Sequence, residues 1–198
     1  MQSIRERIDK EFAGILPYHE IFYLNAIRNA ASKSIRHYND FLAGNLETHT
    51  ADAACYEFFS AVTQAASVSS FFWPNPRNEK LQVRGQTLRQ SFDPLSVARI
   101  KDRKLRHSIV HLDERLDKFC ASETYGELID GFIGSVDKVS APHQKILRLV
   151  DPINKIAILH GYEFKYTGFF ESIAQIGQDA IEMIEAGGRL RKEKSGES

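Results

Sequence analysis

The sequence contains few cysteines and no long apolar run. Its two cysteines, Cys55 and Cys120, lie far apart and match no metal-binding or redox spacing, which predicts a reduced, cytoplasmic compartment. Ser, Thr, Gln or charged residues interrupt the apolar patches before the roughly 20 residues that a membrane span needs. The first residues, MQSIRERIDKEF, are charged and lead into no apolar run, so we expect no secretory signal. The composition therefore predicts a soluble protein with no membrane partner.

An excess of one charge sign is also absent, because 26 Lys and Arg balance 26 Asp and Glu. A neutral chain has no overall field that would recruit nucleic acid. The distribution is uneven, however, since residues 77–106 carry nine basic and three acidic side chains. The basic ones are Arg77, Lys80, Arg84, Arg89, Arg99, Lys101, Arg103, Lys104 and Arg106. This region has two readings that the sequence leaves open: a surface that holds a few phosphates, or a solvated charged loop.

The sequence is rich in apolar residues, at 42% of its 198 residues with 13 Phe, which predicts one globular domain. Residues 20–43 place apolar side chains at alternating steps of three and four, which is the stripe of an amphipathic helix. Residues 51–73 repeat this pattern and add many small residues, which let another helix approach closely. We therefore expect an antiparallel pair of helices joined by a polar loop at 44–50.

Three more helices are predicted in the middle of the chain. The first is short and amphipathic and spans about 79–91. Asp93 is a good N-cap and Pro94 suits the first helical position, so a long helix should start there and run to about residue 121. Thr124 and Glu127 match a capping box. The helix that follows would carry Leu128, Ile129, Phe132, Ile133 and Val136.

Near the C-terminus the pattern changes to strands and back to helix. KILRLV and KIAILH flank DPIN, which predicts a small β-hairpin over residues 145–160. A last helix is expected across about 168–186. The prediction is thus a mainly α single domain over 1–187, followed by a flexible charged tail over 188–198.

The segment 103–119, RKLRHSIVHLDERLDKF, has an unusual polar face for a helix. His107 and His111 are spaced i, i+4 and so share one side, opposite the apolar stripe. Arg106 lies roughly 140° around the helix from His111, so the two would meet only if Arg106 reaches around or a second copy of the helix packs alongside. Two alternatives remain. The histidines and Asp113 or Glu114 could bind a metal, or all of them could simply make ion pairs.

RHSIVH matches a pattern of Arg, a polar residue, three residues of any kind and His, set late in a long helix. It resembles the HEPN superfamily, the higher-eukaryote and prokaryote nucleotide-binding domains. The resemblance extends over about 70–119, where FFWP, RGQTLRQSF and the helix ending in HLDERLD look like a group of bacterial HEPN-like proteins with an arginine-rich loop. It implies an up-down helical bundle.

The resemblance also implies a function, a metal-independent endoribonuclease whose cleft is shared by a homodimer. His111 would act as the acid or base, Arg106 would brace the scissile phosphate, and His107 would orient Arg106 or the phosphate. Arg84, Arg89 and Arg103 would contact neighbouring phosphates, and Asp113 and Glu114 would support the site. No cofactor or metal is implied, and the expected partners are RNA or a nucleotide and an antitoxin-like protein.

The chain departs from the family pattern at Asp113, where some HEPN toxins carry a tyrosine that a partner nucleotidyltransferase modifies. That regulation is therefore not expected here. The alternative to a ribonuclease is a non-catalytic HEPN-like module, whose polar cleft binds a nucleotide or a protein partner or seals the homodimer.

Overall fold

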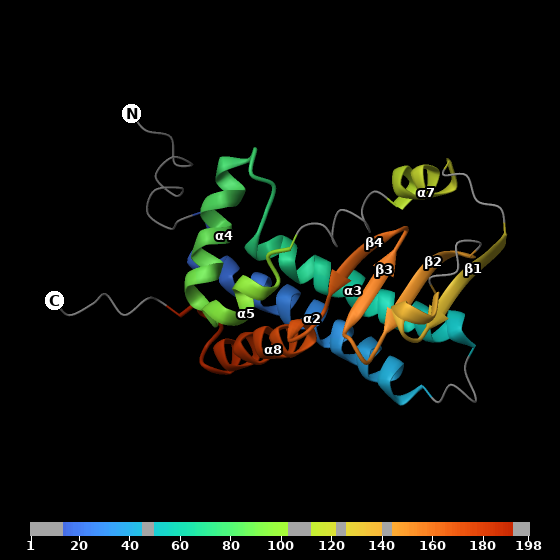
Figure 1. Cartoon of the computed structure of the whole chain (residues 1–198). Coiled ribbons are helices and arrows are strands. Elements are labelled where there is room, and N and C mark those ends of the chain that lie inside the picture. The colour runs from blue at the N-terminus through green and yellow to red at the C-terminus, as the bar shows by residue number, and fades with distance from the viewer. Residues whose placement is uncertain (1–13, 45–49, 103–111, 122–125, 140–143, 192–198) are drawn as a thin grey trace. The chain divides into compact units, whose positions relative to one another are not determined.

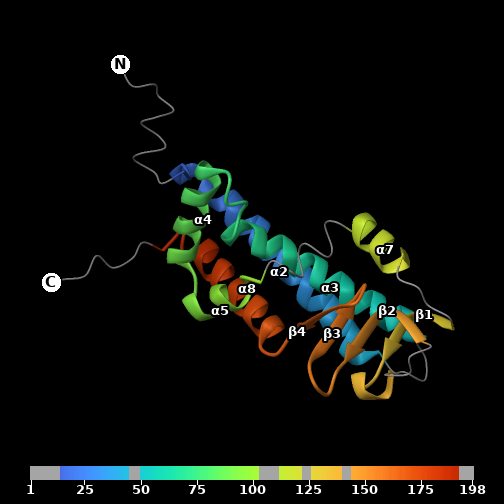
Figure 2. The same cartoon turned by 45° about the horizontal axis from the view of Figure 1, so that its top comes forward.

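The computed structural model describes residues 14–44, 50–102, 112–121, 126–139 and 144–191. Their contacts fall into two compact units (Figures 1 and 2). Unit 1 comprises 1–33, 64–101 and 171–198, and unit 2 comprises 34–63 and 102–170. The fold is mainly helical with a small four-stranded sheet near the C-terminus, as the sequence predicted in outline. Whether the helices follow the HEPN arrangement stays a prediction, as does the single domain over 1–187.

Unit 1 is built from helices. After the short 3-10 helix η1 (Pro17–His19) it contains the first half of α2 (Glu20–Ala43), the second half of α3 (Ala51–Phe72), α4 (Glu79–Ser91), α5 (Pro94–Arg99) and most of α8 (Phe169–Glu185). The helices predicted at 20–43, 51–73, 79–91 and 168–186 are confirmed. Apolar side chains that are fully buried fill its core, among them Leu24, Ile27, Val68, Phe72, Leu88, Ile173 and Ile176.

Local capping explains where α4 and α5 begin. The Asn78 side chain accepts a hydrogen bond from the N–H of Leu81 at 3.2 Å. Asp93 does the same for the N–H of Ser96 at 2.7 Å, with Pro94 in the first turn of the helix. The predicted start at Asp93 and Pro94 is confirmed, because the carboxylate satisfies an N–H that has no partner within the helix.

The single helix predicted from 94 to about 121 is wrong. α5 ends at Arg99, and the next described helix, α7, spans Leu112–Ala121. At the break the carbonyl of buried Ile100 accepts a hydrogen bond from Ser69 Oγ at 2.7 Å, while the N–H of Lys101 turns back to Ala98 O. The Ser69 hydroxyl thus donates to a carbonyl that, in a continuing helix, would accept a hydrogen bond from a backbone N–H of the next turn.

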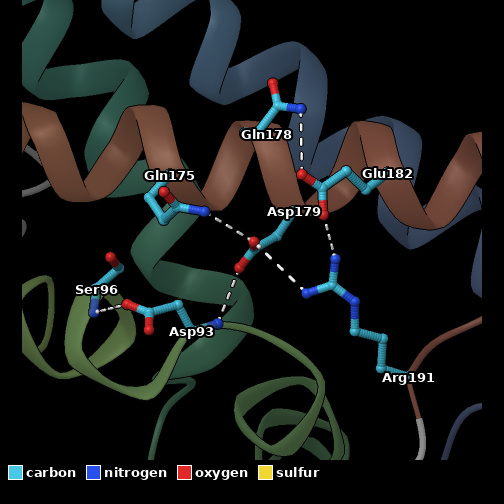
Figure 3. A network of polar contacts seen from close by, with 7 residues as sticks. All are labelled: Asp93, Ser96, Gln175, Gln178, Asp179, Glu182 and Arg191. Atoms are coloured by element: carbon cyan, nitrogen blue, oxygen red, sulfur yellow. Dashed lines mark hydrogen bonds and ion pairs between the residues drawn. The ribbon is translucent and has the colours of Figure 1, made fainter.

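A buried carboxylate joins three parts of unit 1 (Figure 3). Asp179 on α8 accepts hydrogen bonds from the backbone N–H of Asp93 at 2.9 Å and from Gln175 Nε2 at 3.0 Å. Arg191 lies 3.6 Å from the same carboxylate and also pairs with Glu182. Asp179 is 3% exposed, so these partners compensate the cost of burying its charge.

The first residues of the segment predicted to be a flexible tail make contacts with the rest of unit 1. The Arg189 guanidinium donates to Glu20 Oε2 at 2.8 Å, and the N–H of Leu190 donates to the same oxygen at 2.9 Å. Leu190 itself is buried. The predicted tail from 192 onward lies outside the described residues.

Unit 2 combines helices with the sheet. It contains the second half of α2, the first half of α3, α7 and the 3-10 helix η2 (Val136–Val139). The strands are β1 (Glu127–Ile133), β2 (Gln144–Asp151), β3 (Ile156–Leu159) and β4 (Tyr162–Lys165), in the order β1-β2-β3-β4. β1 and β2 are parallel and the other neighbours are antiparallel. An aromatic core of Phe41, Phe58, Phe59, Tyr166 and Phe170 connects α2 and α3 to the sheet and to the start of α8.

The helix predicted to carry Leu128 to Val136 is wrong, because this segment forms strand β1. Leu128 is 75% exposed whereas Gly131 is buried, a pattern that follows the alternation of a strand. A Cβ at Gly131 would lie 2.6 Å from Asp52 Oδ1 and 3.1 Å from Asp52 Cα. Contact with α3, distant in sequence, therefore overrides the local helical pattern.

The predicted β-hairpin is confirmed as β2 and β3, in which Arg148 pairs with Leu159. It is part of a larger sheet, since β1 and β4 extend it on both sides. No helix among the described residues is both long and apolar enough to span a membrane.

Candidate functional site

Most of the motif predicted to be catalytic lies outside the described residues. This applies to Arg106, His107 and His111 and also to Arg103. Asp113 and Glu114 are described and lie exposed in the first turn of α7. The roles assigned to all six residues stay predictions.

Arg84 and Arg89, predicted to contact phosphates, lie on α4 against the end of α3. Arg84 Nη2 donates to the carbonyl of Ser70 at 3.3 Å, and Arg89 Nη1 donates to that of Phe72 at 2.5 Å. The Arg89 guanidinium also lies over the Trp73 ring at 4.4 Å, and burial lowers its pKa. These carbonyls belong to the last turn of α3, where cations compensate the negative end of the helix dipole. Both arginines therefore help to hold α3 and α4 together.

A cavity in unit 2 brings together charged, imidazole and aromatic side chains that were not predicted as site residues from the sequence. Its volume is about 350 Å³. α3, α7, three strands and the turn after β3 contribute to it. The lining residues are Tyr56, Phe59, Ser60, Thr63, Leu116, Asp130, Leu147, Arg148, Leu159 and His160. One side of the cavity is aromatic and aliphatic, and the side chains of Asp130, Arg148 and His160 supply its charged and imidazole groups.

His160 occupies an unusual backbone position in this cavity. It forms the two-residue turn between β3 and β4 with Gly161, and both have positive φ, 51° and 77°. A type I′ hairpin turn requires positive φ at both positions and favours Asn, Asp or Gly at the first. A histidine is tolerated there at some cost. The turn is fixed by the N–H of His160, which donates to Leu147 O at 2.9 Å.

The imidazole of His160 is buried, has a ring nitrogen without a hydrogen-bond partner among the described residues, and has a lowered pKa. The residue is 5% exposed, and its Nδ1 has no hydrogen-bond partner among the described residues. Burial lowers the pKa of His160, and the positive charges of Arg148 and Arg115 lower it further. The imidazole is therefore neutral at pH 7 and lies in a positive potential.

Arg148 is the cationic residue among those that line the cavity. It pairs with Asp130 on the neighbouring strand β1, while its Nε is buried with no partner among the described residues. Its side chain is 22% exposed and that of Asp130 is 52% exposed. The guanidinium is thus held in place by the carboxylate and still has an unused donor.

Helix α7 packs against the same turn. The Arg115 guanidinium lies 3.8 Å from the centre of the Tyr162 ring, and the Phe119 ring lies 6.1 Å from that of His160. The Lys145 ammonium is 4.7 Å from the centre of the Phe119 ring. Through Leu116 the helix also lines the cavity. α7 therefore adds positive charge and apolar cover, and it begins at the residue that follows the motif histidine in the sequence.

One signal for this site was present in the sequence. A His-Gly pair directly after the apolar run KIAIL is a hairpin-turn dipeptide with His in place of the usual Asn. Arg148 in the middle of KILRLV was a second hint, since it interrupts an apolar strand. Tyr56 and Asp130 carried no local signal, because they join the cavity only through tertiary contacts.

Comparison with known proteins gave no match among family models, curated proteins or solved structures.

Proposed function

We propose that the chain is a HEPN-like protein that associates with RNA or a nucleotide, and that the cavity of unit 2 binds the phosphate and the base of one nucleotide. The observation that carries this proposal is the presence of a buried neutral imidazole and a strand arginine in one cavity with an aromatic wall. The resemblance of RHSIVH to the HEPN motif supports the same class of ligand.

The charges favour an anion. Arg148 and Arg115 both act on His160, and Asp130 offsets only part of their charge. A phosphate oxygen would accept from the exposed part of the Arg148 guanidinium, whose planar group of donors suits phosphate. Its negative charge would also raise the pKa of His160, so that binding and proton uptake are coupled.

The shape favours a single nucleotide rather than a duplex. A volume of about 350 Å³ is near the lower end of the range of about 300–1,000 Å³ for small-molecule sites. Tyr56 and Phe59 offer ring surfaces on which a base can lie. An unpaired base and its phosphate would therefore fit.

The catalytic form of the proposal uses the motif of the resemblance. The 2′-oxygen of RNA would bond to phosphorus as the bond to the 5′-oxygen breaks, with His111 moving a proton and Arg106 stabilising the phosphate charge. A homodimer would bring the two motif copies together, as the family implies. In the alternative, non-catalytic form the same ligand is bound and not cut.

Binding is tested by calorimetry with 5′-AMP and adenosine. We expect 5′-AMP to bind about 10-fold or more tightly than adenosine, because a charge-assisted contact contributes roughly 1.5–3 kcal/mol. His160→Asn keeps the positive φ of the turn and removes the imidazole, and it should weaken 5′-AMP binding. His19→Asn, at an exposed position in unit 1, is the matched control. The proposal would be contradicted if 5′-AMP and adenosine bound with equal affinity. It would also be contradicted if His160→Asn and His19→Asn bound 5′-AMP equally well.

Cleavage is tested separately with mixed RNA in the presence of a chelator. The catalytic form predicts cutting that His111→Ala abolishes, and sedimentation should show a species of twice 22.5 kDa. Binding of 5′-AMP without any cutting would favour the non-catalytic module.

A further inference from the structure

A second group of chemically active side chains lies in unit 2, on the facing sides of α2 and α3. His37 and Asp40 are spaced i, i+3 on α2 and so share one side of that helix. Glu57 projects toward them from α3, with its Oε2 2.7 Å from His37 Nδ1. One nitrogen and two carboxylate oxygens from the three residues lie within 4.8 Å of one another. Among the described residues no second group of three such side chains comes this close.

We propose that His37, Asp40 and Glu57 bind a divalent transition-metal ion of the Zn²⁺ class. An imidazole nitrogen with two carboxylates suits Zn²⁺ and its first-row neighbours, whereas Mg²⁺ and Ca²⁺ prefer oxygen ligands alone. This site is distinct from the proposed nucleotide cavity, and the cleavage proposed above needs no metal. Either proposal can therefore fail without the other.

The distances suit a small ion. Tetrahedral ligands at about 2.1 Å from a metal lie roughly 3.4 Å from one another. The His37–Glu57 contact of 2.7 Å would have to open slightly, and the Asp40 oxygen, which lies within 4.8 Å of both, would need at most a small adjustment. Since the His37 and Glu57 side chains are 24% and 30% exposed and Asp40 is exposed, rotamer changes suffice for both.

The charges around the group also favour a cation. His37 is the ion-pair partner of Glu57, and among the described residues no Lys or Arg pairs with Asp40 or Glu57. With no Lys or Arg paired with either carboxylate in the described part of the chain, a divalent ion would offset the negative charges that Asp40 and Glu57 bring together.

Three protein ligands leave room for a fourth. Asp40 and Glu57 line a hollow of about 450 Å³ whose other walls are mostly small, with Ala43, Gly44, Ala53 and Ala54, and with Tyr56. A site with three protein ligands and an open position is the arrangement of catalytic rather than structural zinc. The hollow would accommodate water or a small ligand at that position.

The test uses the full chain, freed of metal with a chelator and titrated with Co²⁺ as a spectroscopic probe and with Zn²⁺ by calorimetry. We expect one ion per chain and the visible absorption of Co²⁺ bound to nitrogen and oxygen ligands. Asp40→Asn and His37→Gln should each weaken binding about 100-fold or more, since even outer-shell changes cost roughly 10–100-fold. His19→Gln, which changes an exposed histidine of unit 1, should bind like wild type.

Asp40→Asn is the decisive variant, because Asp40 is exposed and its loss leaves the His37–Glu57 contact in place. Its circular dichroism and melting temperature without metal should match wild type. Equal Zn²⁺ affinity in wild type and Asp40→Asn would overturn the proposal, and so would the absence of binding at 100 μM metal. If His19→Gln loses binding as strongly as His37→Gln, the ion lies elsewhere and the assignment is wrong.

Discussion

The turn between β2 and β3 provides the sharpest test of the fold around the cavity. Asp151 is fully buried, and its carboxylate accepts four hydrogen bonds. They come from the backbone N–H groups of Val136, Ile153 and Asn154 at 3.1, 3.0 and 2.9 Å, and from Asn154 Nδ2 at 2.8 Å. The same side chain thus fixes the hairpin turn and ties η2 to it. Replacing it should loosen the hairpin that carries His160.

The expected magnitude follows from the lost contacts. Asp151→Ala leaves three backbone N–H groups without their acceptor, at roughly 1 kcal/mol each for partly buried donors. We therefore expect the free energy of unfolding to fall by about 3 kcal/mol and the melting temperature to fall by about 6–12 °C. Asp151→Asn keeps one acceptor oxygen and should cost less than Asp151→Ala. Asp137→Ala, an exposed acid in η2, is the control and should change stability by less than about 0.5 kcal/mol.

The pH dependence gives an independent check by urea denaturation. Burial raises the pKa of Asp151, but the hydrogen bonds from Asn154, Val136 and Ile153 together lower it below its ordinary value of 3.8. A carboxyl whose pKa is depressed on folding stabilises the protein above the unfolded pKa, and this contribution is lost as the pH falls through the folded pKa. The gap between wild type and Asp151→Asn should therefore be full at pH 6 and shrink below about pH 4. A gap that stays constant down to pH 2, or a cost of Asp151→Ala below 1 kcal/mol, would refute the reasoning.

Three further outcomes follow from single positions. Gly131→Ala should destabilise the protein by about 1–3 kcal/mol in urea denaturation, because the new Cβ would lie 3.1 Å from the backbone Cα of Asp52 and 2.6 Å from its Oδ1. Asp179→Ala should cost about 3 kcal/mol by the same assay, since it leaves the Asp93 N–H and the Gln175 amide without their acceptor and leaves Arg191 with its pairing to Glu182; an unchanged midpoint would contradict the network of Figure 3. His160→Asn should gain stability relative to wild type as the pH falls below 6.5, because burial, Arg148 and Arg115 lower the pKa of His160 on folding and protonation then favours the unfolded chain. A pH-independent difference would show that the imidazole is not buried in a positive potential.

The helices were predictable where periodicity and capping agreed. The bounds of α4 follow from Asn78 as N-cap, and those of α5 begin at Asp93 and Pro94. The break after Arg99 was not predictable, because the hydroxyl that captures the Ile100 carbonyl comes from Ser69, 31 residues earlier. Strand β1 was missed for the same kind of reason. Its apolar spacing also fits a helix, and the strand is favoured by pairing with β2 and by the close approach of α3 at Gly131, neither of which is local.

The candidate cavity, too, could be predicted from the sequence only in part. The hairpin was predicted, but its register was not, and this register is what pairs Arg148 with Leu159 and brings it beside His160. Asp130 joins them only because β1 pairs with β2 in parallel register, and Tyr56 only because α3 packs against the sheet. Two members of the group of His37, Asp40 and Glu57 could be placed together from the sequence, because His37 and Asp40 are spaced i, i+3 on one helix. Its third member depends on the register between two helices, which the sequence does not specify.

The backbone of the β3–β4 turn argues that His160 has a role beyond packing. Asn or Gly at this position would adopt a positive φ with less strain and would bring no buried ring nitrogen without a partner. A buried unpaired polar atom costs roughly 1–3 kcal/mol, so the protein carries both a conformational and a solvation cost at one residue. Such costs cluster at binding and catalytic sites. An anion in the cavity would offset these costs by giving the protonated imidazole a counter-charge. For that reason His160→Asn is expected to leave the unliganded protein at least as stable as wild type at pH 7 while weakening its binding of 5′-AMP. Loss of both stability and binding in that variant would show that the histidine serves the turn alone.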